Sequence, residues 1–135
     1  MSAMFRFWYD VQVRFRDIDL FGHTHHTAAL IYVEEARAAY WREVAGRADL
    51  NDIDYVLGEV RVRYLKRITY PGTVRVGVRT ANMGGKSFTM EFEIRSGDEV
   101  LASGETTQVM FDRSTGTPIP IDSALRSKLD AYERG

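Results

Sequence analysis

One short stretch of the chain carries most of its residues that could perform acid–base chemistry. Asp17 and Asp19 lie two positions apart, and all three histidines of the chain follow at His23, His25 and His26. A carboxylate can attack an acyl carbon or take a proton from water, and an imidazole can share that proton. The stretch therefore predicts a site for nucleophilic or general-base chemistry.

The elements on either side of this stretch would position it. Val11, Val13 and Phe15 alternate with polar residues, which predicts a strand with one buried face. Residues 27–44 contain no Pro or Gly and are apolar around most of the circumference, which predicts a helix enclosed by other elements. A strand-to-helix turn presents free backbone N–H groups to a ligand, so we expect the site at this turn.

The rest of the chain is expected to form a sheet and a second, short helix. Apolar alternation predicts strands at about residues 59–64, 74–79, 88–95 and 100–111, the last with Gly104 as a candidate bulge, and a helix from about residue 122. Short connections favour antiparallel pairing, and the simplest packing is an α+β fold with about five strands curled around the long helix. We expect residues 1–135 to form a single domain.

The composition narrows the class of protein. Eighteen basic residues against 19 acidic ones argue against a nucleic-acid partner. The absence of cysteine excludes disulfides, a Cys nucleophile and Cys-ligated metal sites. The N-terminal residues lack a signal-peptide pattern, and the longest uncharged apolar run, residues 28–33, is too short to span a membrane. We therefore expect a cytoplasmic protein.

Each motif also has an interpretation without catalysis. Asp often caps helices or forms turns, so Asp17 or Asp19 could cap the following helix. A metal site would need carboxylates such as Asp17 or Asp19 beside the histidines, and we expect none. Gly85-Lys86-Ser87 ends like a phosphate-binding loop, but Thr80 stands where that loop needs glycine and a strand follows, which excludes a nucleoside triphosphatase. This turn could contact a ligand phosphate or only connect two strands.

A basic run at residues 61–67 also has a structural and a functional interpretation. Its cations, ending at Arg67, could cover a solvated strand face or bind the phosphates of a charged substrate.

Residues 15–23, Phe-Arg-Asp-Ile-Asp-Leu-Phe-Gly-His, and residues 32–37, Tyr-Val-Glu-Glu-Ala-Arg, resemble a known family. They are similar to the hotdog-fold acyl-CoA thioesterases of the 4-hydroxybenzoyl-CoA thioesterase-like branch, and the resemblance covers about residues 8–112. It implies a sheet wrapped around a central helix, and homodimers or homotetramers with active sites at the subunit interface. It also implies an acyl-CoA substrate, or an acyl carrier protein in its place, and no cofactor.

The resemblance also implies roles for single residues. The second Asp of the pair is the catalytic carboxylate of the family, which corresponds to Asp19. The position seven residues later supplies a backbone N–H at the helix start and corresponds to His26, where many relatives carry Asn or an aromatic residue. The Gly-Lys-Ser turn would lie near the coenzyme A nucleotide. The expected substrate-binding residues are Gly22, His23, Arg67, Lys86 and Ser87.

These roles define an expected mechanism and its alternatives. The His26 N–H and the helix dipole would stabilise the oxyanion of a thioester carbonyl, while Asp19 either attacks the carbonyl or deprotonates a water. The His26 side chain could orient that water or share its proton, and we expect Asp17 to be structural. The same fold could instead serve as a non-catalytic acyl-CoA-binding protein or as a dehydratase, with Glu34 or Glu35 as the acid.

Overall fold

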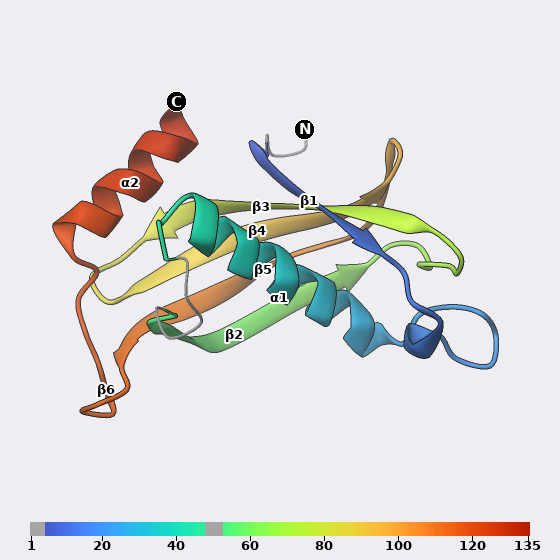
Figure 1. The fold of residues 1–135 in the computed structure, drawn as a ribbon, viewed down its shortest axis with the longest axis horizontal. Helices are drawn as coiled ribbons and strands as arrows, with labels where there is room; N and C mark the ends of the chain where they lie inside the picture. The colour runs from blue at the N-terminus through green and yellow to red at the C-terminus, as the bar shows by residue number, and fades with distance from the viewer. Residues whose placement is uncertain (1–4, 48–52) are drawn as a thin grey trace.

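The structure, a computed structural model, describes residues 5–47 and 53–135. A long helix crosses one face of an antiparallel sheet, and a second helix lies against one end of it (Figure 1). The sheet order is β1-β3-β4-β5-β2, and β6 pairs with β5. The elements are β1 (Phe7–Gln12), the 3-10 turn η1 (Phe15–Asp17), α1 (His26–Glu43), β2 (Tyr55–Tyr64), β3 (Thr73–Met83), β4 (Ser87–Ser96), β5 (Glu99–Asp112), β6 (Thr117–Pro118) and α2 (Ser123–Arg134).

This architecture confirms the predicted α+β hotdog fold, with a long central helix and a short C-terminal one. The predicted start and end of the long helix were each within one residue of those observed. Neither α1 nor α2 combines the length and hydropathy that crossing a bilayer requires.

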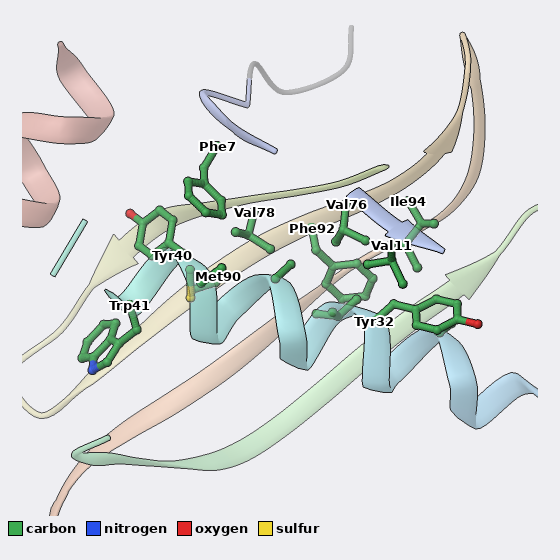
Figure 2. Packing of buried hydrophobic residues seen from close by; sticks show 14 of the residues in the cluster. Phe7, Val11, Tyr32, Tyr40, Trp41, Val76, Val78, Met90, Phe92 and Ile94 are labelled. Atoms are coloured by element: carbon green, nitrogen blue, oxygen red, sulfur yellow. The ribbon is translucent and has the colours of Figure 1, made fainter. Parts of the chain in front are cut away.

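Small and aromatic side chains of α1 fill the space under the sheet. Four alanines of α1 are buried and let the sheet approach the helix closely. Tyr40 and Trp41 fill the far end of the core (Figure 2). The Trp41 ring stacks on Phe88 of β4, with ring centroids 5.4 Å apart. Fully burying one such side chain stabilises the fold by about 1.5–3 kcal/mol. The helix is therefore held by its packing, as its apolar circumference predicted.

Alternate residues of β4 separate the two faces of the sheet. Phe92 and its neighbours on one face pack against α1, while Glu91 and Glu93 point to the other face. There Glu91 pairs with Arg79 at 2.7 Å and Glu93 pairs with Arg95 at 2.5 Å. The period-two pattern in the sequence thus placed the core correctly on this strand.

Gly104 does not form the predicted bulge. It pairs regularly with Phe92 and Val62, and the irregular pairings of the described strands lie elsewhere, as between Leu57 and Glu59. A Cβ at position 104 would lie 2.0 Å from the carbonyl oxygen of Arg61 and 2.8 Å from the Phe92 ring. The glycine therefore allows close approach of the neighbouring strand.

The first strand begins and ends earlier than predicted. β1 ends at Gln12, and Phe15, expected on its buried face, begins η1 and is 72% exposed. The Asp17 N–H donates to the Arg14 carbonyl at 2.9 Å, and the Asp17 side chain accepts from the Arg14 N–H at 3.3 Å. This reciprocal pair stabilises a turn where the alternating pattern suggested more strand.

Candidate active site

A tight turn after η1 holds Asp19 by its own backbone. Its Oδ1 accepts hydrogen bonds from the N–H groups of Phe21, at 2.9 Å, and His23, at 3.2 Å. The Asp19 N–H donates in turn to the His23 carbonyl at 2.8 Å. Gly22 closes this turn with a φ of +78°, a conformation that residues with a Cβ rarely adopt. A Cβ there would meet nothing within 4 Å, so the turn needs glycine for its φ and not for space.

The same hydrogen bonds set the charge of Asp19. The bond from the Phe21 N–H is the largest influence and lowers the pKa of the carboxyl below its ordinary value, and partial burial opposes this only in part. Asp19 is therefore an anion at neutral pH. Its second oxygen, Oδ2, accepts no hydrogen bond from the residues that the structure describes, so it is open to a ligand.

Asp17 has a different environment two residues earlier. Its Oδ2 accepts a hydrogen bond from the Tyr32 hydroxyl at 2.7 Å, and its carbonyl accepts from the His25 N–H at 2.8 Å. Burial, and then the bond to Asp17, raises the pKa of Tyr32. Asp17 thereby ties η1 to the first turns of α1, which supports the structural role expected of it.

The start of α1 offers backbone donors beside this turn. His25 is the N-cap and makes no side-chain capping bond, so neither Asp17 nor Asp19 caps the helix. His26 is the first helical residue, and its N–H and that of Thr27 donate no hydrogen bond within the described residues, whereas the Ala28 N–H donates to the His25 carbonyl at 3.0 Å. The Tyr64 hydroxyl donates to the His26 carbonyl at 2.5 Å and ties the helix start to β2.

Two cavities flank the helix start, and they divide the histidines. Asp19 lines a cavity of about 580 Å³ with His25 and four apolar residues of the same loop. His23, His26 and Arg67 line a second cavity of about 250 Å³, beside the end of β2. Within one chain, His25 and not His26 shares the cavity of Asp19, contrary to the expected placement of the His26 side chain. The catalytic and binding roles of these residues stay predictions.

The difference arises because neighbouring residues at a helix start point in different directions. His25 has an extended backbone, with φ −61° and ψ 148°, while His26 is already helical. Its position directly before the helix was the available signal for His25, but the sequence did not indicate which histidine would face Asp19.

Lys86 and Ser87 lie at the opposite end of the sheet. Ser87 begins β4, whereas the loop that follows β2 donates hydrogen bonds to the carbonyl of Leu101 in β5, which lies beside the other end of β4. Ten extended residues span roughly 30 Å, so these two side chains do not reach the Asp19 cavity of the same chain. Figure 1 shows the β3–β4 connection and the start of α1 at opposite ends of the molecule.

The loop around Asp19 presents large apolar side chains to solvent. Leu20 is 101% exposed, Phe21 81% and Phe15 72%. Exposed apolar groups of this size, gathered around one carboxylate, are typical of a surface that another molecule covers. Among residues 5–47 and 53–135, no cluster of three or more His, Asp or Glu side chains is arranged to hold a metal ion.

Comparison with known proteins agrees with this geometry. The model of the Thioesterase-like superfamily matches residues 13–129. A thioesterase from Thermus thermophilus, solved in complex with coenzyme A and Zn, is 33% identical and has a TM-score of 0.89, covering 97% of this chain and 96% of its own. A predicted thioesterase from Bacillus stearothermophilus is 26% identical with a TM-score of 0.86, covering 93% and 94%.

A curated relative is less informative about activity. The uncharacterized protein YsmA of Bacillus subtilis (strain 168) is 28% identical over 67% of this chain, and the match spans 62% of that protein's length. The family match over residues 13–129 and the fold define the class of protein. The chain belongs to the Thioesterase-like superfamily.

Proposed function

We propose that this protein is an acyl-CoA thioesterase that hydrolyses a thioester to the free acid and coenzyme A, with Asp19 as its catalytic carboxylate. The observation that carries the proposal is the arrangement of Asp19. Two backbone N–H groups fix Oδ1, Oδ2 is open, and the free N–H groups of a helix start lie a few residues away. Membership of the superfamily supports the reaction class, and the coenzyme A bound to the Thermus protein supports the substrate class.

Asp19 could attack the thioester directly or act as a general base, and we favour direct attack because its Oδ2 is open. Its lowered pKa keeps the carboxylate ionised, as either role requires. Asp19 Oδ2 would attack the thioester carbon, the carbon–sulfur bond would break, and the coenzyme A thiolate would leave and take a proton from solvent. Water then cleaves the mixed anhydride, and His25, in the same cavity, is placed to accept its proton.

The carbonyl oxygen needs stabilisation when it becomes an oxyanion. The His26 N–H at the positive end of the α1 dipole would supply it, as expected from the sequence. Arg67 and His23 line the adjoining cavity and would contact the coenzyme A moiety. Gly22 contributes through the backbone turn that holds Asp19.

The functional unit in this proposal is a homodimer, alone or within a homotetramer. β2 is an edge strand, and its apolar residues Val56, Leu57 and Val60 are exposed. Pairing of two β2 edges about a two-fold axis would bring these residues to the subunit interface, where the active sites are proposed, and reverse one chain against the other. The partner's Lys86 and the partner's Ser87 would then approach the helix start of this chain, which neither reaches within its own chain.

A thiol-release assay with a panel of short, long and aromatic acyl-CoAs tests the proposal. We expect steady release of coenzyme A over many turnovers with at least one of them. Tight binding of acyl-CoA without release would contradict catalysis and leave a binding protein. Sedimentation velocity of the same sample tests the assembly, and a monomer that is fully active would contradict the shared site.

A further inference from the structure

A narrow groove between α1 and β2 contains a buried cation that the proposed mechanism does not use. This α1–β2 groove has a volume of about 220 Å³ and mostly apolar walls. Its lining residues are Leu30, Ile31, Val33, Glu34, Arg37, Leu57, Val60 and Thr106. Methylene groups would be well accommodated by such walls, but the charge of Arg37 needs a separate explanation.

Arg37 is only 5% exposed, yet it has little to compensate its charge. Its Nε donates one hydrogen bond of 3.3 Å to the Tyr55 hydroxyl, and the guanidinium lies 5.8 Å from the centre of the Tyr55 ring. In the part of the chain that the structure describes, no carboxylate lies within ion-pair distance of it. Buried charges are normally paired because an isolated one is costly. Among residues 5–47 and 53–135 the guanidinium thus lacks a counter-charge, which an anionic ligand would supply.

Two hydroxyl groups, Thr106 of the groove lining and Tyr55 beside Arg37, can act as further donors. The Thr106 hydroxyl accepts a hydrogen bond from the Gln108 side chain, so its own proton remains available to a ligand. Burial raises the pKa of Tyr55, so its hydroxyl also keeps its proton. Two hydroxyl donors beside a guanidinium match the acceptor oxygens of a carboxylate.

We propose that Arg37 binds a carboxylate at the far end of the acyl group, so that the preferred substrates are ω-carboxyacyl-CoAs, the monothioesters of dicarboxylic acids. This inference rests on the proposed thioesterase function. α1 rises roughly 16 Å from His26 to Arg37. Helical side chains tilt back toward the N-terminus, so the guanidinium reaches part of the way toward the reacting carbonyl. The acyl chain between the two ends would be of medium length and lie along the apolar walls.

Glu34 is a carboxylate of the same chain that can compete with a ligand carboxylate for Arg37. It lines the same groove three residues before Arg37, and it is exposed. Its charge would repel an incoming carboxylate or compete with it for Arg37. Removal of that charge should therefore strengthen the site, whereas removal of the Arg37 charge should weaken it.

The test compares kcat/KM for thiol release between ω-carboxyacyl-CoAs, from succinyl-CoA to sebacyl-CoA, and plain acyl-CoAs of the same length. For the wild type we expect a preference for the carboxylated substrate of at least about tenfold at one or more lengths, as a charge-assisted hydrogen bond would give. Arg37→Met should abolish this preference, Arg37→Lys should retain part of it, and Glu34→Gln should increase it. Arg42→Met, an exposed arginine on the same helix, is the matched control and should leave the ratio unchanged.

The outcomes separate the inference from the proposed function. Release from plain acyl-CoAs with no preference in the wild type would overturn the inference and leave the thioesterase intact, whereas no release from any substrate would refute the thioesterase itself. If Arg37→Met lowers turnover of both substrate classes equally and dissociates the oligomer in sedimentation, Arg37 pairs across subunits and the inference fails. Because the wild-type preference is measured without a variant, misfolding of Arg37→Met would still leave the inference testable.

Discussion

The two ends of α1 differ in how completely they are packed. At the C-terminal end, Trp41 stacks on Phe88, and the Tyr40 hydroxyl bonds to both Thr80 and Glu133 of α2. At the N-terminal end, the helix begins beside exposed apolar residues and a carboxylate with an open oxygen. Figure 2 shows the Tyr40 hydroxyl directed toward α2 and the Tyr32 hydroxyl directed toward the start of the helix. One end therefore stabilises the fold, and the other leaves groups available for chemistry.

Trp41→Ala should give the largest loss of stability, because it removes a fully buried ring at the closed end. We expect the free energy of unfolding to fall by about 3–5 kcal/mol. Urea unfolding at a fixed protein concentration measures it, with Arg42→Ala on the exposed face as control. A loss similar to that of the control would mean that the closed end does not carry the stability assigned to it.

Asp19→Asn should give the largest loss of activity, because it keeps the size of the side chain and removes its charge. We expect turnover of the best acyl-CoA to fall by at least about 100-fold, with little change in the melting temperature. Asp17→Asn is the matched variant and should mainly lower stability through its bond to Tyr32. An equal loss of turnover in a folded Asp17→Asn protein would reverse the two roles.

Gly22→Ala should have a smaller effect and should lower both stability and activity, because Gly22 closes the turn that holds Asp19 at the open end. Because Gly22 has a positive φ, an alanine there should lower the free energy of unfolding by about 1–2 kcal/mol. The distorted turn should also hold the Asp19 side chain less firmly. Gly85→Ala is the control for stability, because a Cβ there is also free of contacts and its φ is not in the left-handed region. Equal losses of unfolding free energy in the two variants would show that the φ at position 22 is unimportant.

The pH dependence of stability that arises from Asp19 should be the smallest effect. Its folded-state pKa lies below its ordinary value, so Asp19 stabilises the fold above the unfolded-state pKa, and this contribution is lost as pH falls through the folded-state pKa. A carboxyl ¹³C NMR titration should therefore give a midpoint below that of the urea-unfolded chain. A midpoint at or above the unfolded value would contradict the stabilisation of the carboxylate by the Phe21 and His23 N–H groups.

The two ends also differ in how well the sequence predicted them. The closed end was predictable because period-two and helical patterns report burial, which is why Phe88 and the apolar circumference of the helix were correctly placed. The open end was only partly predictable. The local hydrogen bonds of Asp17 ended the strand early, and the backbone of His25 determined which histidine faces Asp19. Such contacts depend on individual φ and ψ values that residue types alone do not specify.

The positions of residues far from Asp19 in the sequence were harder still to predict. The type of Lys86 suggested a phosphate contact, but its distance from Asp19 follows from the length of β4. Arg37 was noted only as part of a helix pattern, and its isolation in the α1–β2 groove became evident once the neighbouring strands were in place.

The space left empty at position 104 has a consequence for how this chain can vary. Even alanine there would strike both the backbone of β2 and the ring of Phe92, so the edge strand would have to move away from the sheet. Because that same edge carries the exposed apolar residues, its displacement would alter the outer contour of the molecule as well as its interior. A saturation library should therefore tolerate no residue except glycine at this position, although it lies far from Asp19 in the sequence.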